Sequence, residues 1–302
     1  MSKITPHLWF DREAVEAAEF YASTFPSSRV TDVSTLHDTP SGDCDVVSFE
    51  LFGQPFMAVS AGPLFAFTPA VSFLVRCSSA KEVDELWARL SEGGTALMPL
   101  DAYDFSERYG WTEDRYGLSW QLMHAGDMDG GQRIVPTLLF VRDLWGKAEE
   151  AVGFYTSVFP DSSVGQMVRY GPEEGPDAGT IKHAGFTLAG QELAAMDSAD
   201  EGHEFGFNEA ISLMVGCDTQ EEIDYYWERL SAVPEAEQCG WLKDRFGLSW
   251  QVVPSRLNEL LAGGSDEQKA RVTEAFLRMR KFELAELQRA YDEAEVRVGG
   301  EA

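Results

Sequence analysis

Apolar residues recur along the chain with two different periods, and the two periods alternate in a fixed order. Residues 4–10 form an extended apolar run, and residues 29–36, 46–52 and 56–60 show the pattern typical of strands. Between them lies a segment with apolar side chains at helical spacing, closed by Pro26: Val15, Ala18, Phe20, Tyr21 and Phe25. The pattern predicts a strand-helix-strand-strand-strand unit.

The same order then begins again. Residues 71–75 form an apolar run typical of a strand, and residues 80–90 have helical spacing and stop at Gly93-Gly94. Shorter strands are predicted at residues 95–98, 109–112 and 118–123. We therefore expect two units of this kind in the first part of the chain.

The second half of the chain repeats the first. Residues 111–122 (WTEDRYGLSWQL) return as residues 241–252 (WLKDRFGLSWQV), displaced by 241 − 111 = 130 positions. Residues 70–77 return as 210–217, displaced by 210 − 70 = 140, so the second copy has gained loop near residues 171–179 and lost loop near Pro234. Length changes confined to loops indicate two copies of one fold, and thus four βαβββ units.

We therefore predict an α+β protein of two tandem domains, residues 1–125 and 133–254, joined by a linker at residues 126–132. A helical C-terminal extension, residues 255–302, follows them. It begins with a helix at 255–261 and a Gly263-Gly264 break, after which Ser265 is a candidate helix cap. Its apolar stripe is typical of a structural brace, with a partner-binding helix as the alternative: Val272, Phe276, Met279, Leu284, Leu287 and Tyr291.

The composition excludes some classes of partner. The net charge is −27, from 51 acidic and 24 basic residues, which argues against nucleic-acid and anionic membrane surfaces. No apolar run reaches the length of a membrane span, and the polar start runs directly into a strand pattern without a signal peptide, so we expect a cytoplasmic protein. The four cysteines lack metal-type spacing and indicate inert thiols: Cys44, Cys77, Cys217 and Cys239.

The repeated segments also carry a family signature. Residues 4–10 (ITPHLWF), the Phe20-Tyr21 pair and residues 114–121 (DRYGLSWQ) together resemble PhnB-like proteins of the vicinal oxygen chelate superfamily. That superfamily includes glyoxalases, extradiol dioxygenases and bleomycin-resistance proteins. The resemblance implies paired βαβββ units whose strands curl into a cleft, with four metal ligands, mostly His and Glu, in the metalloenzymes. Some relatives are labelled 3-demethylubiquinone methyltransferases, but this chain has no strand followed by a glycine-rich turn for a methyl-donor cofactor.

The metal ligands that the resemblance implies have no counterpart here. Alternation along the first strand of each repeat points Thr5, His7 and Trp9, and then Val135, Thr137 and Leu139, toward the cleft. The four ligand positions align with the pairs Thr5 and Val135, Ala58 and Ala195, Ser72 and Ser212, and Gln121 and Gln251. None of these is an imidazole, thiolate or carboxylate, so we predict that neither copy binds a catalytic metal.

Two ionisable residues are candidates for catalysis at the cleft. His7 has a cleft-facing strand position and could act as an acid or base, although a hydrogen-bonded wall residue is the simpler interpretation. Asp197 is the one carboxylate that the alternation points to the same face, with a strand-end residue in water as its alternative. The other histidines, His37, His124, His183 and His203, are predicted to be surface residues.

The sequence favours a binding protein for a small, largely apolar molecule, without a cofactor. The predicted cleft residues are His7, Trp9, Ser72, Gln121, Thr137, Asp197, Ser212 and Gln251. The alternative is a lyase, isomerase or dioxygenase that uses a divalent metal at a site including His7, and a third hypothesis is clefts filled by side chains. Which units pair, and whether the chain is a monomer or a homodimer, stay open from sequence alone.

Overall fold

A computed structural model describes residues 3–126 and 130–298, so part of the predicted linker, residues 127–129, lies outside the described residues. The first unit comprises β1 (Ile4–Phe10), α1 (Ala14–Thr24), β2 (Arg29–Thr39), β3 (Gly42–Leu51) and β4 (Gln54–Ser60). The second comprises β5 (Val71–Cys77), α2 (Ala80–Leu90), β6 (Thr95–Tyr103), β7 (Ser106–Glu113) and β8 (Ser119–His124). Both follow the predicted order.

The second repeat has the same plan with a shorter end. Its first unit comprises β9 (Ile134–Phe140), η1 (Arg142–Leu144), α3 (Ala148–Val158), β10 (Ser163–Arg169), η2 (Gly175–Asp177), β11 (Ile181–Leu188) and β12 (Gln191–Asp197). The last unit comprises β13 (Ile211–Cys217), α4 (Gln220–Leu230), η3 (Pro234–Ala236), β14 (Trp241–Lys243) and β15 (Ser249–Pro254). In this unit the short helix η3 stands in place of a strand equivalent to β6.

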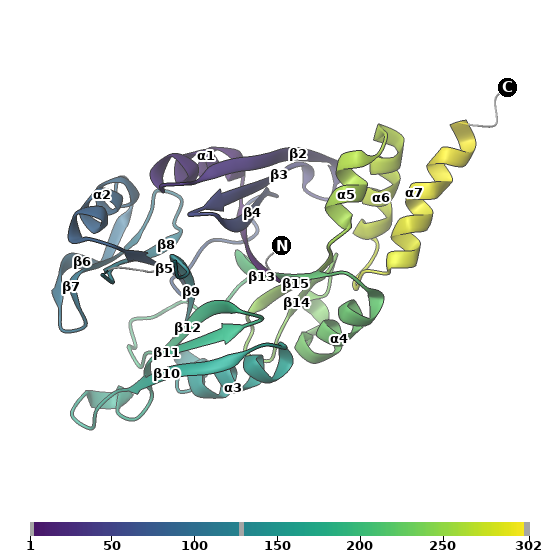
Figure 1. The fold of residues 1–302 in the computed structure, drawn as a ribbon. Coiled ribbons are helices and arrows are strands. Elements are labelled where there is room, and N and C mark those ends of the chain that lie inside the picture. Colours follow the sequence, from purple (N-terminus) through teal and green to yellow (C-terminus); the bar gives the residue numbers. More distant parts are fainter. Residues whose placement is uncertain (1–2, 127–129, 299–302) are drawn as a thin grey trace.

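The units pair across the repeats, which answers the question that the sequence left open. One sheet has the strand order β14-β15-β13-β1-β4-β3-β2, and the other has β10-β11-β12-β9-β5-β8-β7-β6. Each sheet therefore joins the first unit of one repeat to the second unit of the other (Figure 1). The joins are antiparallel, with His7 opposite Ser212 between β1 and β13, and Ser72 opposite Thr137 between β5 and β9.

The main hydrophobic core lies between these sheets and the helices that cover their outer faces. Leu8 and Phe10 of β1 point into it, as the alternation predicted, and so do Trp120 and Trp250, which are fully buried. The opposite face of each sheet is here called its inner face. Inner face A belongs to the seven-stranded sheet and carries His7, Ser212 and Gln251, whereas inner face B belongs to the eight-stranded sheet and carries Thr137, Ser72 and Gln121.

A buried aspartate ties together the two units of each repeat, although those units belong to different sheets. Asp114 accepts hydrogen bonds from the Tyr21 hydroxyl of α1 (2.7 Å) and from the Trp120 indole nitrogen (2.9 Å). It also accepts bonds from the backbone nitrogens of Tyr116 and Leu118. The second repeat reproduces the arrangement with Asp244, Tyr155 and Trp250. The repeated DR(Y/F)GLSWQ segment is thus explained by a structural requirement.

The C-terminal extension forms three helices: α5 (Leu257–Gly263), α6 (Asp266–Leu277) and α7 (Leu284–Val298). Ser265 caps α6 through a capping box with Gln268, as its position predicted. The predicted apolar stripe is divided between α6 and α7, because residues 278–283 leave the helical conformation and run past β14. Val272 and Leu287 are fully buried, so the extension packs on the body of the protein. No helix in residues 3–126 and 130–298 is both long and apolar enough to cross a membrane.

Candidate functional site

A row of uncharged polar residues crosses the middle of inner face A. Strand pairing aligns His7 on β1 with Ser212 on β13, and Ser212 with Ser249 on β15. Gln251, two residues beyond Ser249, donates a hydrogen bond from Nε2 to the Ser212 hydroxyl over 2.7 Å. The predicted site residues Ser212 and Gln251 therefore meet His7 on one face, although they come from the other repeat.

Two polar atoms in this row have no hydrogen-bond partner within the part of the chain that the structure describes. His7 is 6% exposed and Ser249 is fully buried, yet neither Nδ1 of His7 nor Oγ of Ser249 is bonded. Burial lowers the pKa of His7 to about 4, because the protonated ring would have no water or anion around it. The imidazole is therefore neutral near pH 7. A buried polar atom without a partner costs about 1–3 kcal/mol, so two on one face require an explanation.

Aromatic rings cover this row. The Trp241 ring of β14 lies edge-on to the His7 ring, with 5.4 Å between the centroids, and the Trp9 ring lies 5.9 Å from the Trp241 ring. Trp9 also contacts Phe65 and donates a hydrogen bond from Nε1 to the carbonyl of Gly62 (2.8 Å). Trp9 thus lies on the same face as His7, as the alternation predicted. Trp241 and Ser249 were not among the predicted site residues, although their spacing from Gln251 could have indicated them.

Inner face B has the same framework, but its polar atoms are bonded. Gln121 donates from Nε2 to the Ser72 hydroxyl (2.8 Å), and its Oε1 accepts a bond from the Tyr109 hydroxyl (2.8 Å). The hydroxyl of Thr137 bonds the Val135 carbonyl. Ser119, which is the counterpart of Ser249, accepts a 2.7 Å bond from the Trp111 indole nitrogen.

Side chains also fill inner face B. A second apolar cluster lies there, separate from the main core: Leu74, Tyr109, Val135 and Ala194, with Met98, Tyr103, Trp111 and Met123 packed against it. Tyr103 comes from strand β6, which has no equivalent in the second repeat. The counterpart of Tyr109 at offset 130 is Cys239. Inner face A therefore has no counterpart of Tyr103, and it has a cysteine in place of Tyr109.

Three predicted positions on the fourth strands were wrong. Ala58 pairs with Leu8, and Ala195 with Leu138, so both alanines point into the main core. Asp197 pairs with Phe140 and points to the same side. Its carboxylate accepts hydrogen bonds from the backbone nitrogens of Ala148 (3.1 Å) and Ile181 (3.0 Å). Asp197 thus binds the start of α3, and it is excluded from the site residues.

The residues of the fourth strands that do point to the inner faces are not metal ligands either. The inner-face residues of the fourth strands are Met57 and Val59 in the first repeat, and Ala194 and Met196 in the second. No group of three or more His, Cys, Asp or Glu side chains that could hold a metal ion lies within residues 3–126 and 130–298. One imidazole beside serine and glutamine does not match the His and carboxylate donors of catalytic zinc sites. Neither inner face fits a catalytic metal.

The remaining histidines and the four cysteines lie outside this row. His37 is exposed as predicted, but His124, His183 and His203 are half-buried. His124 and His183 lie on strands, whereas His203 lies in a loop, where it bonds Ser198 and packs against Phe205. Burial and the neighbouring Arg76 guanidinium lower the pKa of His183 on β11. All four cysteines are free. Burial raises the pKa of the Cys77 and Cys217 thiols to about 12, in agreement with the predicted inert thiols.

Four strand-helix-strand units that pair into two curled mixed sheets define the glyoxalase-like fold of the vicinal oxygen chelate superfamily. Glyoxalase I from Zea mays is 11% identical and matches with a TM-score of 0.54 over 86% of this chain and 96% of its own. A putative dioxygenase from Bacillus subtilis is also 11% identical and matches with a TM-score of 0.50 over 98% of this chain and 96% of its own. These likenesses concern the fold alone.

The family follows from the sequence match. The model of a family described as 3-demethylubiquinone-9 3-methyltransferase matches residues 2–123 and again residues 132–253, so the chain belongs to this family as a tandem duplication. A putative 3-demethylubiquinone-9 3-methyltransferase from Bacillus cereus, described as a PhnB protein, is 37% identical over 40% of this chain and 98% of its own, with a TM-score of 0.38. No curated protein matches the chain.

Proposed function

We propose that this protein binds a small, uncharged and largely apolar molecule at inner face A, without a catalytic metal. The observation that carries the proposal is the pair of buried, unpartnered polar atoms, His7 Nδ1 and Ser249 Oγ, on one aromatic-lined face. The two residues are separated by one strand, which puts their backbones roughly 10 Å apart. A molecule with a hydroxyl, carbonyl or amide group can reach either atom and supply the missing hydrogen bond.

The internal duplication provides the comparison that supports this function. The counterparts of the polar residues on inner face B are bonded within the chain, and aromatic residues of β6 and β7 occupy the space beside them. The two copies of this face therefore differ in whether their polar atoms are bonded within the chain. A structural role explains the fully bonded copy, whereas the other copy retains the cost of two unpartnered polar atoms, which binding of a ligand would offset.

The charges around inner face A favour an uncharged ligand. His7 is neutral because burial lowers its pKa, and the Lys243 ammonium is paired with the Glu209 carboxylate at 2.8 Å. The remaining side chains of the row, Ser212, Ser249 and Gln251, carry no charge. An ionic ligand would lose its hydration without gaining a counter-ion, which is costly in an aromatic-lined site.

The methyltransferase activity in the family description is not part of this proposal. The five junctions where a described strand leads into the next α-helix hold at most one glycine, Gly146, before α3. The glycine-rich turns that cradle dinucleotide and phosphate groups need several glycines at such a junction. A small-molecule binding function requires no such turn.

A pair of matched variants tests the proposal, with the neutral apolar dye Nile red as the probe. Trp241→Leu removes the ring above His7, and Trp111→Leu makes the same change at the equivalent position of inner face B. We expect Trp241→Leu to weaken dye binding about tenfold or more, equal to about 1.4 kcal/mol, and Trp111→Leu to leave Kd within about twofold. Absence of binding by the wild type, or a stronger effect of Trp111→Leu, contradicts the proposal.

A further inference from the structure

One edge of the seven-stranded sheet is held by the segment that joins α6 to α7. The backbone nitrogens of Cys239 and Gly240, just before β14, donate to the carbonyls of Met279 (2.8 Å) and Arg280 (2.7 Å). Gln220 of α4 bonds the Phe282 carbonyl from its side chain (3.0 Å). These bonds fix residues 277–284 beside β14 and α4.

The opposite edge of the same sheet is also in contact with the C-terminal extension. Helix α6 contacts β2, the last strand at that edge. Leu36 of β2 points to the inner side of the sheet. Ser34, two residues earlier on the same strand, shares its face, and Ser34 is aligned through Val46 of β3 with the inner-face residue Val59 of β4. Leu36 is partly buried against the main apolar core, to which Val272 and Phe276 of α6 also belong. The extension therefore bridges the two edge strands of the curled sheet.

Helices α5 and α6 consequently lie between β2 and the strands β13, β14 and β15, at the inner side of the seven-stranded sheet (Figure 1). We call residues 255–277, which form α5 and α6, the flap. Among the described residues, the contact between the flap and β2 is apolar, without a hydrogen bond. The eight-stranded sheet has no such cover in the described chain, and its own β6–β7 hairpin fills inner face B instead.

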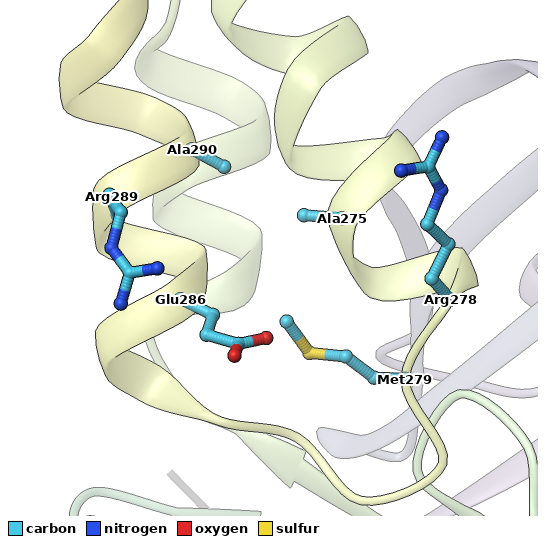
Figure 2. Close-up of a pocket in the computed structure, with 6 residues that line it drawn as sticks. All are labelled: Ala275, Arg278, Met279, Glu286, Arg289 and Ala290. Carbon is cyan, nitrogen blue, oxygen red and sulfur yellow. The ribbon is translucent and has the colours of Figure 1, made fainter.

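An open groove of about 360 Å³ lies at the surface where α6 meets α7, and Met279 and Glu286 reach toward it beside the short side chains Ala275 and Ala290 (Figure 2). Backbone hydrogen bonds attach the far end of the flap to β14, whereas the described residues of the flap and of β2 share none. An attachment without hydrogen bonds opens at a lower cost in free energy. The contact with β2 is therefore the weaker of the two attachments.

We propose that the flap is a lid, which swings away from β2 to admit a ligand to His7 and closes over it. The proposal rests on the proposed function for its purpose, but the movement itself can be tested without a ligand. The lid hinges at residues 254–256 and 278–283, the non-helical segments at its two ends. Opening breaks the apolar contact between β2 and the flap while the hydrogen bonds at β14 persist.

Chemical modification of His7 tests the lid directly. Diethyl pyrocarbonate carbethoxylates neutral imidazoles, and peptide mass spectrometry of the full chain then gives the rate at His7 relative to His124 in the other sheet. Leu36→Ser weakens the lid contact, and the matched control Val33→Ser changes an exposed apolar residue on the opposite face of the same strand. We expect the His7 rate to rise roughly fivefold in Leu36→Ser, equal to about 1 kcal/mol of opening free energy, and not in Val33→Ser.

The outcomes separate the lid from the binding function. An unchanged His7 rate in Leu36→Ser, or an equal rise in Val33→Ser, overturns the lid. The association rate of Nile red, measured with the same variants, should rise in Leu36→Ser if the lid controls access to the binding face. If the dye fails to bind any form while the His7 rate responds as expected, the lid stands and the proposed function fails.

Discussion

Replacement of His7 by phenylalanine should make the protein more stable and less sensitive to acid. Phenylalanine keeps a flat aromatic ring, somewhat larger than imidazole, and lacks the unpartnered Nδ1 atom. At pH 7.5 the ligand-free His7→Phe variant is expected to gain about 1–3 kcal/mol in unfolding free energy, the cost of a buried polar atom without a partner. If His7 is retained because it binds a ligand, its replacement should raise the stability of the ligand-free protein and weaken ligand binding.

The pH dependence follows from the pKa of His7, which burial lowers from 6.5 to about 4. As the pH falls below 6.5, the unfolded chain binds a proton at this residue and the folded chain does not. Stability contributed by the neutral ring is therefore present at pH 7.5 and is lost progressively on acidification. Between pH 7.5 and 5 the loss is about 2 kcal/mol, from 1.36 kcal/mol per pKa unit over roughly 1.5 units of pH.

Urea unfolding followed by tryptophan fluorescence measures this effect at pH 7.5, 6.5, 5.8 and 5.0. This range stays above the pI of about 4.4, where loss of net charge favours aggregation. All other ionisable groups are shared, so their contributions cancel in the difference between wild type and His7→Phe. His37→Phe, at an exposed histidine, is the control. If the wild type and His7→Phe lose stability in parallel between pH 7.5 and 5, the buried neutral histidine is refuted.

Four further substitutions test the framework around the site. Tyr21→Phe and Tyr155→Phe should each cost about 1.5–3 kcal/mol of unfolding free energy, because each removes a hydrogen bond to a buried carboxylate, and urea titration should show nearly additive effects. Tyr109→Phe should cost about 0.5–1.5 kcal/mol without changing Nile red affinity, since its bond lies on inner face B. Gly240→Ala should loosen the C-terminal extension, detectable as faster proteolysis there, because the added Cβ would lie 2.4 Å from Phe282 and the backbone has a φ of +82°. Tyrosine variants as stable as the wild type, altered dye affinity in Tyr109→Phe, or unchanged proteolysis in Gly240→Ala would contradict the respective packing.

The predicted units and the inner face of β1 could be read from the sequence because polar and apolar residues alternate there with a clear phase. His7 and Trp9 face the inner side for that reason. The phase of β4 could not be read, since Phe56, Met57, Ala58 and Val59 are all apolar and either face would bury them equally. The error at Asp197 has the same origin in the second repeat.

The pairing of units across the repeats could not be predicted from the sequence either. Each unit presents the same edge strand to either partner, so local pattern cannot choose between them. The site follows from this choice, because His7 meets Ser212 and Ser249 only when the first unit pairs with the last. The loop lost near Pro234 indicated from the sequence that the two repeats differ. The sequence could not show that this difference affects the inner faces, because it does not reveal that Tyr103 and Tyr109 lie on inner face B.

Stoichiometry tests the central claim most directly, because the account assigns one binding face to a chain built from two similar halves. Native mass spectrometry of the full chain, incubated with Nile red, counts the bound molecules. We expect one molecule per chain in the wild type and in Trp111→Leu, and a lower bound fraction in His7→Phe, which lacks one of the two hydrogen-bonding atoms. Two molecules per chain, or an unchanged bound fraction in His7→Phe, would contradict the account.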